Sequence, residues 1–380
     1  MCTGITSLMV YPSVTLIDDH AFAGCESLEE VTLEASTQPL TIGFQPGTDQ
    51  HGPFWQSPLN NVVLKREITP TEAYAAACDQ YDEGIFANEH GLETIEGRND
   101  LTVQIISNVN TIHPFMFSGW GMDDLTIPAC VTEIKDFAFY NCKKLTDLTI
   151  SSSTQPLTIG FQDWDDELGP FYQSPLKNIK LGRNIVYNDN YAESCDSWDE
   201  GAFSNEYYDD NVEWTTDLIL GPNVTTILKY MFAGTRIQQL HIPETVENIG
   251  VNVIENNKKL NAIIFYDETE RPNVEYGAFG VDEETLGLIT GPPGNGQYYV
   301  FVPYRLGRLG SYRGELYYTQ DDLVHDTYWA VLNAIMVDDQ PRDDYYQPHR
   351  NTESWYLNVT GYEWYKARYY DYITITPPTI

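Results

Sequence analysis

The feature that most constrains the fold of this chain is a ten-residue stretch that occurs twice. STQPLTIGFQ stands at Ser36–Gln45 and again, letter for letter, at Ser153–Gln162, an offset of 117 residues. Ten identical letters in a chain of 380 residues do not recur by chance. The repeat reflects either a duplicated catalytic element or a repeated structural unit, and the two imply different kinds of function.

The similarity continues on both sides of this stretch at the same offset. Ser13–Leu33 (SVTLIDDHAFAGCESLEEVTL) matches Cys130–Ile150 (CVTEIKDFAFYNCKKLTDLTI), and Gly52–Leu64 matches Gly169–Leu181. A third, weaker copy begins near Val246, displaced by 115 residues. The chain is therefore built from a large duplicated unit.

A shorter period divides this unit. Short apolar–x–apolar segments, which we expect to be strands, follow one another at steps of 22 or 23 residues, with longer steps of 31 and 39 to 41. They end at Val10, Leu33, Leu64, Ile105, Ile127, Ile150, Leu181, Leu220, Ile242 and Phe265. A step of about 20–29 residues is typical of a leucine-rich solenoid, and the longer steps indicate coils with inserted loops.

A phenylalanine precedes many of these strand ends by ten or eleven residues. The positions are Phe22, Phe54, Phe117, Phe139, Phe171 and Phe232. One coil cannot bury its own apolar residues, but stacked coils can pair their strands about 4.8 Å apart in a parallel sheet. We therefore expect the phenylalanines to form one continuous column between the strands.

The pattern of one coil, V-T-x-I-x-x-x-A-F-x-x-C-x-x-L-x-x-L-T-I, resembles BspA-like leucine-rich repeats. The I-P-x-x-V step between coils, at Ile127–Val131 and Ile242–Val246, is similar to the same family. The resemblance covers about Val10 to Phe265. It implies a bacterial surface protein of Bacteroidetes type, and a right-handed repeat solenoid, mainly β with short helical or irregular turns, with inserted loops and a C-terminal cap.

We expect three parts along the chain. Residues 1–290 form the leucine-rich repeat solenoid, 291–340 a closing coil or cap, and 341–380 an aromatic-rich tail or strand pair. Tyr298–Arg313 and Trp329–Ile335 resemble the closing coil and final strand of the family, although Leu306–Leu323 interrupts the usual spacing.

The charge of the chain limits its partners. With 21 basic and 56 acidic residues, the net charge is −35. Nucleic acid and anionic membranes are poor partners for such a field, whereas a basic protein or a neutral glycan is compatible with it. No apolar run approaches the roughly 18 residues of a transmembrane helix, and no signal peptide opens the chain. These features fit either a cytoplasmic protein or one whose signal peptide has been removed. With the family resemblance, we expect a monomeric, extracellular or outer-surface protein after removal of a signal peptide not present in this chain.

The cysteines follow the repeat. Cys25 and Cys142, and likewise Cys78 and Cys195, are 117 residues apart, as expected of repeat positions. Small buried thiols are common in cores, so we expect free thiols rather than disulfides. No CxxC or zinc-type spacing is present.

Acidic residues gather in three expected loops without an apolar pocket around them. They are Asp163, Asp165, Asp166 and Glu167; Asp196, Asp199 and Glu200; and Asp209 and Asp210. A glycosidase needs two carboxyl groups about 5–10 Å apart, one with a raised pKa, so solvated charge is the simpler interpretation. The histidines form no metal-binding motif, and no G-x-S-x-G elbow occurs. We expect no enzyme activity, catalytic residue, metal ligand or cofactor; calcium in the acidic loops stays open.

The inserted loops are rich in aromatic residues, which we predict to be the ligand-binding residues. They are Trp164, Tyr172, Tyr187, Tyr191, Trp198, Tyr207, Tyr208 and Trp214. Insertions at equivalent coils leave from the same face, and Tyr and Trp both anchor protein interfaces and stack on sugars. For any single ring, the simpler interpretation is that it folds back over its own coil. For the set, we predict a binding surface.

Three function classes fit these observations. The first, which we predict, is a non-enzymatic surface protein that uses the repeat scaffold for protein binding and adhesion to host matrix or neighbouring cells. The second is a carbohydrate-binding surface module that uses the Trp and Tyr loops. The third is a hydrolase, which requires two acids at a cleft.

Overall fold

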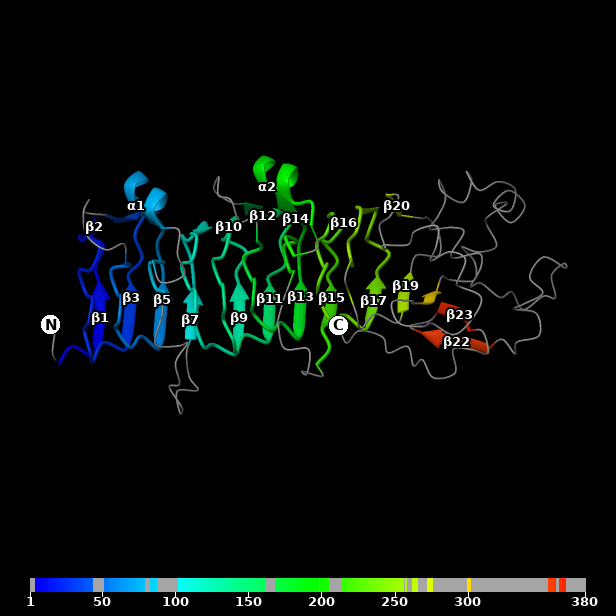
Figure 1. Cartoon of the computed structure of the whole chain (residues 1–380), viewed down its shortest axis with the longest axis horizontal. Coiled ribbons are helices and arrows are strands. Elements are labelled where there is room, and N and C mark those ends of the chain that lie inside the picture. Colours follow the sequence, from blue (N-terminus) through cyan, green and yellow to red (C-terminus); the bar gives the residue numbers. More distant parts are fainter. Residues whose placement is uncertain are drawn as a thin grey trace. The chain divides into compact units, whose positions relative to one another are not determined.

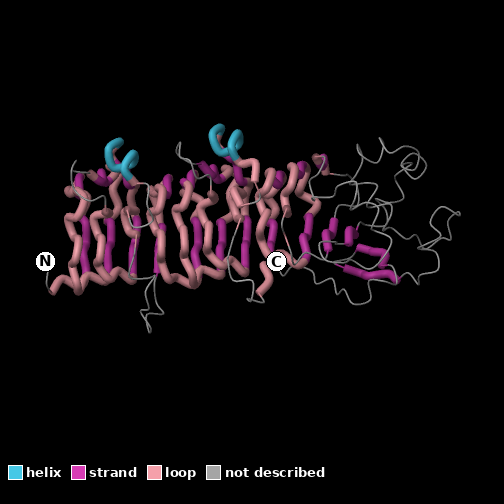
Figure 2. The backbone as a smooth tube through the Cα atoms, viewed as in Figure 1, coloured by secondary structure: helices cyan, strands magenta, loops and turns pink. Residues whose placement is uncertain are grey.

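The computed structural model describes residues 4–43, 51–78, 83–87, 102–160, 168–197, 199–204, 214–255, 257, 262–265, 272–275, 299–301, 355–359 and 362–366. The chain forms two compact units, one of residues 1–179 and 185–212, the other of residues 180–184 and 213–380. Strands predominate. The α-helices among the described residues are α1 (Glu72–Ala77) and α2 (Asp189–Ser194), as Figure 2 shows.

The first unit contains a first row of parallel strands, one from each coil. One sheet has the order β1 (Ser7–Val10), β3 (Glu30–Leu33), β5 (Asn61–Leu64) and β7 (Thr102–Ile105); the next has β9 (Asp124–Ile127), β11 (Asp147–Ile150) and β13 (Asn178–Leu181). Within the first sheet each strand pairs in register with the next, so that the last residues of β1, β3, β5 and β7 lie side by side. β9 and β11 pair in the same way in the next sheet. Figure 1 shows this succession of arrows. The expected stack of coils is confirmed.

A second row of shorter parallel strands runs through the same coils. It consists of β2 (Leu16–Ile17), β4 (Leu40–Ile42) and β6 (Ile68–Pro70), then β8 (Thr111–Ile112), β10 (Glu133–Lys135), β12 (Leu157–Gly160) and β14 (Ile185–Tyr187). The twice-occurring STQPLTIGFQ contributes β4 in one copy and β12 in the other. The repeated stretch is therefore structural.

Seven phenylalanine rings stack in one phenylalanine column through the first unit. Neighbouring centroids are 5.3–5.9 Å apart, with interplanar angles of 5–14°. The column consists of Phe22, Phe54, Phe86, Phe117, Phe139, Phe171 and Phe203. The expected column is confirmed in the first unit and also contains two rings that the spacing rule missed, Phe86 and Phe203. They were missed because the chain between each ring and its strand carries an insertion. Phe232, also expected in the column, is buried in the second unit, and its stacking stays a prediction.

A buried serine hydroxyl joins neighbouring coils beside this column. Ser174 Oγ donates to Phe139 O at 2.8 Å and accepts the Cys142 N–H at 3.0 Å. Ser57, the equivalent residue of the first copy, makes the same two bonds one repeat earlier. The four cysteines of the repeat positions are buried free thiols, as expected. Burial raises the pKa of Cys142 to about 12, so this thiol stays protonated.

Close approach of coils explains one glycine of the turn beside Phe86. A Cβ on Gly84 would collide with the backbone carbonyl of Phe115 in the next coil. Only glycine lets the two backbones come this near.

The second row is interrupted between β6 and β8, which belong to different sheets. There the side chain of Glu67 takes the place of a backbone hydrogen-bond acceptor. The Glu67 carboxylate accepts the N–H of Asn110, and the ring Nε2 of His113 lies 2.9 Å from Ile68 O. Partial burial raises the pKa of Glu67. In the second copy the equivalent residue is Asn184.

The second unit continues with the same kind of coils. There Asn184 Oδ1 accepts the N–H groups of Thr225 and Thr226, at 2.8 and 3.2 Å. The first-row strands are β15 (Asp217–Leu220), β17 (Gln239–Ile242), β19 (Ala262–Phe265) and β21 (Tyr299–Phe301); the second-row strands are β16 (Thr226–Ile227), β18 (Asn248–Ile249) and β20 (Asn273–Val274).

The last described elements are β22 (Trp355–Val359) and β23 (Tyr362–Lys366), an antiparallel pair. β21 falls within the expected closing coil, and the expected final strand Trp329–Ile335 lies outside the described residues. The predicted domain boundaries at 290 and 340 are not tested and stay a prediction.

Candidate functional site

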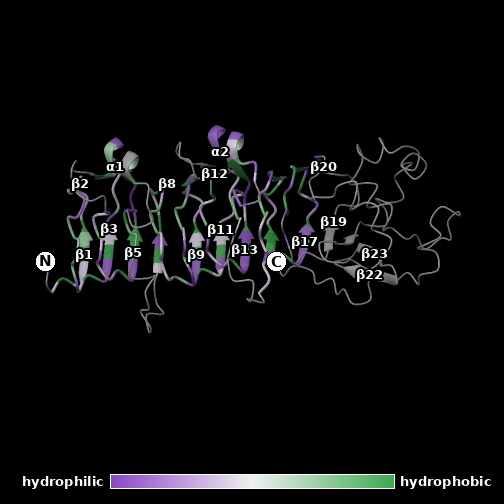
Figure 3. Cartoon of the chain, in the orientation of Figure 1, coloured by the Kyte–Doolittle hydropathy of each residue, from purple (hydrophilic) through white to green (hydrophobic). Residues whose placement is uncertain are grey.

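The outward side chains of the first-row strands form a polar surface, which we call the strand face. Along each strand the inward residues are buried and the alternate residues point outward, so the strands carry both hydrophobic and hydrophilic residues (Figure 3). On β3 to β13 the strand face consists of Glu30, Thr32, Asn61, Val63, Thr102, Gln104, Asp124, Thr126, Asp147, Thr149, Asn178 and Lys180. The helices α1 and α2 lie beside the second row instead (Figure 1).

Hydrogen bonds between strands fix several of these side chains. Thr102 Oγ1 donates to Asn61 Oδ1 at 2.9 Å, and Asn178 Nδ2 donates to Asp147 Oδ1 at 2.8 Å. The second carboxylate oxygen of Asp147 accepts from Thr146 Oγ1 at 2.6 Å. These bonds already restrict the side chains, so less side-chain conformational entropy is lost when a ligand binds. The strand face is in this sense preorganised.

Two aspartates of the strand face lie directly opposite each other. Asp124 on β9 is paired in register with Asp147 on β11, and both are exposed. Like charges at directly opposed positions destabilise a sheet. A cationic group bound between them would relieve this repulsion, which makes the pair a natural contact for a basic side chain.

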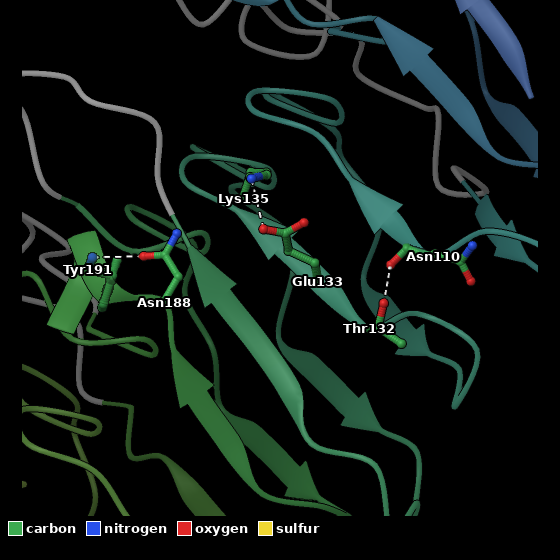
Figure 4. Close-up of polar contacts among 6 residues, drawn as sticks. All are labelled: Asn110, Thr132, Glu133, Lys135, Asn188 and Tyr191. Atoms are coloured by element: carbon green, nitrogen blue, oxygen red, sulfur yellow. Dashed lines mark hydrogen bonds and ion pairs between the residues drawn. The ribbon is translucent and has the colours of Figure 1, made fainter.

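The outward side of the second row also carries polar side chains with local contacts. Lys135 Nζ lies 2.8 Å from Glu133 Oε1 on β10, and Thr132 Oγ1 donates to Asn110 O at 3.3 Å; Figure 4 marks both contacts. The same figure shows Asn188 Oδ1 accepting the Tyr191 N–H at 2.8 Å, the bond that caps α2. The N-cap of α2 stands directly after β14, so this side adjoins the inserted helix.

The inserted helices fold back on their own coils through tyrosines. In α2 the Tyr191 hydroxyl donates to Glu200 O, and Tyr187 Oη accepts the Ala202 N–H at 3.3 Å. In α1 the equivalent Tyr74 hydroxyl donates to Glu83 O at 2.5 Å. Full burial raises the pKa of these phenols well above its usual value. They therefore act as neutral packing groups.

Four of the eight predicted ligand-binding rings are buried. Tyr187 and Tyr191 pack as described, Tyr172 stacks on Tyr140 at 6.2 Å between centroids, and the Trp214 ring lies under the Arg236 guanidinium at 4.9 Å. All four rings are buried in the solenoid, but Tyr172 and Trp214 meet residues of a neighbouring coil rather than of their own. The other four, Trp164, Trp198, Tyr207 and Tyr208, lie outside the described residues. Ligand contact by the set stays a prediction.

The described acidic cluster after α2 closes a turn. Glu200 Oε2 accepts the N–H groups of Asp196 and Ser197, at 2.6 and 2.9 Å, and Asp199 accepts the Ser197 hydroxyl. Within the described part of the chain, no three His, Cys, Asp or Glu residues are arranged to hold a metal ion. The clusters at 163–167 and 209–210 lie outside that part, so calcium binding is untested.

Two histidines of the coils have shifted pKa values: His241 is buried and His113 is half-buried. Burial lowers the pKa of His113, and it lowers that of His241 on β17 to about 4. Both rings are therefore neutral at pH 7 and serve packing. Among the helices that the structure describes, none is long and apolar enough to cross a membrane.

Stacked parallel strands, a repeating coil and an internal phenylalanine column define a leucine-rich repeat solenoid. The sequence matches the family described as BspA type leucine rich repeat region, six copies, over residues 1–102, 99–161, 167–261 and 208–280. The chain therefore belongs to the BspA-type leucine-rich repeat family. Scaffolds of this class generally mediate protein interaction without enzymatic activity, and BspA-type proteins are typically found at the cell surface or secreted.

Among solved structures, the chain is similar to a leucine-rich repeat protein from Bacteroides ovatus ATCC 8483. The two are 18% identical with a TM-score of 0.37, and the match covers 72% of this chain and 62% of that protein. The chain thus spans less than two thirds of that relative's length. No curated protein matches the chain.

Proposed function

We propose that this protein is a non-enzymatic surface or secreted adhesion protein that binds a protein ligand on the strand face. The observation that carries the proposal is the ordered surface of outward polar side chains on the first-row strands, which lies away from α1 and α2. The family supports protein binding as the general role. This mode of binding needs no cofactor.

The charge of the strand face indicates the kind of ligand. Its exposed ionic groups are three acids, Glu30, Asp124 and Asp147, and one cation, Lys180, on a chain with net charge −35. Complementary charge steers encounter and selects partners. The proposed ligand is therefore a protein segment that carries Lys or Arg, such as a basic stretch of a host matrix or neighbouring-cell protein.

The first test measures binding of the purified chain to a panel of matrix proteins and glycans at about 50 and about 500 mM NaCl. An interface between acidic and basic surfaces weakens as salt screens its charges. We expect a protein hit whose affinity falls at high salt. A glycan hit indifferent to salt would instead favour the carbohydrate-binding alternative, and loss of binding with EDTA would indicate calcium.

The second test places the ligand on the strand face with matched variants. Asp124→Asn removes one charge of the opposed pair, and Thr126→Arg adds a bulky cation on the same strand. Thr158→Arg makes the same addition on the second row. We expect the first two to weaken binding about tenfold or more, as loss of a close charge pair does, and the third to leave it unchanged. Equal effects of Thr126→Arg and Thr158→Arg would refute the proposed face.

A further inference from the structure

The fold explains only part of the twice-occurring stretch STQPLTIGFQ. Its leucine and isoleucine are buried in the second-row strands, β4 in one copy and β12 in the other. The four letters before them, STQP, form a turn that joins a first-row strand to a second-row strand. We call residues 36–39 and 153–156 the STQP turns. Burial accounts for the leucine and isoleucine but not for the identity of the turns.

The two STQP turns have the same local structure. Ser36 Oγ accepts the Gln38 N–H at 2.9 Å, and Ser153 Oγ accepts the Gln155 N–H at 3.0 Å. In both turns the threonine, glutamine and proline after this serine are exposed. They are Thr37, Gln38 and Pro39 in the first copy, and Thr154, Gln155 and Pro156 in the second.

The exposed threonine and glutamine side chains have no structural task within the described part of the chain. There they take part in no side-chain hydrogen bond or ion pair; the bonds that shape the turns use the serine hydroxyl and the backbone N–H. Other exposed positions of these coils differ between the copies: Glu26 corresponds to Lys143, and Glu29 to Thr146. Identical exposed side chains in both STQP turns therefore indicate a role outside the fold.

Both STQP turns lie in the first unit, at the same corner of the coils. From β4 the second row continues through β6, β8 and β10 to β12, with the contact of Glu67 and Asn110 joining β6 to the coil of β8. At about 4.8 Å for each step from coil to coil, the turns are roughly 19 Å apart. Because equivalent turns of a solenoid lie on one face, a single ligand can meet both.

The chemistry of the STQP turns indicates the kind of ligand. Each presents a hydroxyl group, a carboxamide that both donates and accepts, and an apolar proline ring, without any charged residue. The hydroxyl groups of a sugar also donate and accept, so they match the carboxamide. Two equal sites at a fixed spacing favour a ligand that offers the same group repeatedly, because the second contact is then intramolecular. A neutral polysaccharide meets both conditions.

We propose that the two STQP turns are equal subsites for one neutral polysaccharide chain, held by Gln38 and Gln155 together with the hydroxyl groups of Thr37 and Thr154. The turns follow the first-row strands and are not part of the strand face. This binding goes beyond the proposed function and does not depend on it.

The test begins with the full chain on an array of neutral glucans, mannans, galactans and xylans. For a polysaccharide that binds, titration followed by NMR compares the polymer with its disaccharide, which is too short to reach both turns. We expect two equal disaccharide sites per chain. The polymer should bind at least about 100-fold more tightly than the disaccharide, because its second contact is intramolecular. Failure of all these polysaccharides to bind would overturn the proposal.

Matched variants locate the subsites. Gln38→Ala and Gln155→Ala each truncate one STQP turn, whereas Gln104→Ala makes the same change at an exposed position of the strand face. We expect each of the first two to leave one disaccharide site and to weaken polymer binding at least about tenfold, and the double variant to abolish binding. Gln104→Ala should change neither. Circular dichroism confirms that the variants fold. Polymer binding that survives in the double variant, or equal effects of Gln104→Ala and Gln38→Ala, would also overturn the proposal.

Discussion

Removal of one ring from the middle of the phenylalanine column should destabilise the protein strongly. Phe139 is fully buried and stacks on Phe117 at 5.6 Å and on Phe171 at 5.3 Å. A Phe→Ala change in a core costs about 3–5 kcal/mol, and each stacked pair contributes about 0.5–1.5 kcal/mol beyond area burial. Because Phe139 has two stacked partners, we expect Phe139→Ala to lower the free energy of unfolding by about 4–5 kcal/mol.

The matched control is the ring at the end of the column. Phe22 is half-buried and has one stacked neighbour, Phe54, at 5.5 Å. Phe22→Ala should therefore cost only about 1–2 kcal/mol, since less apolar area returns to water. Urea unfolding of the full chain, followed by circular dichroism, measures both. Equal losses, or a loss below about 1 kcal/mol for Phe139→Ala, would refute the idea that stacking along a continuous column stabilises the coils.

Three further changes probe single contacts. Ser174→Ala leaves a buried carbonyl and a buried N–H without their shared partner, so thermal unfolding should show a loss of about 1–3 kcal/mol. The pKa of Glu67 is raised in the folded state, so protonation of Glu67 stabilises the fold at low pH, and this stabilisation is lost as pH rises through the folded pKa. The free energy of unfolding of the wild type, compared with that of Glu67→Gln from pH 4 to 7, should therefore fall as pH rises. The pKa of His241 is lowered to about 4 in the folded state. The neutral ring therefore stabilises the fold above the unfolded-state pKa of about 6.5, and this stabilisation is lost as pH falls towards 4. In His241→Thr the free energy of unfolding should no longer show this decrease between about pH 6.5 and 4, which is at most about 3 kcal/mol in the wild type. The same pH dependence in the variant and the wild type would contradict a buried, neutral His241.

Much of the fold could be predicted because the stacking of coils imposes a period on the sequence. The ten strand ends expected from the apolar segments, from Val10 to Phe265, coincide with the ends of the ten first-row strands from β1 to β19. Each such strand has four residues, and in strands such as β3 and β11 burial alternates over a length that gives a recognisable pattern. Most second-row strands have only two or three residues, such as β2 and β8, and a pattern of period two cannot be recognised over that length.

The candidate site was harder to predict, because sequence alone does not say which way an inserted loop folds. Tyr191 was predicted to be a ligand-binding ring, but its hydroxyl meets a backbone carbonyl nine residues further on and its ring is buried. A capped helix of six residues after Asn188 brings it inward. Asp124 and Asp147 were overlooked because D-L-T-I looks like any half-exposed strand. Only the register shows that the two carboxylates are opposed.

The most direct test of the proposed function is a footprint of the bound ligand on the protein. Hydroxyl-radical footprinting of the full chain, alone and with the protein ligand found in the panel, reports which side chains the ligand covers. We predict protection on the strand face, centred on β9 and β11, while Thr69 and Thr158 on the second row react as in the free protein. Protection confined to the second row and the inserted helices, with β9 and β11 unchanged, would contradict this account.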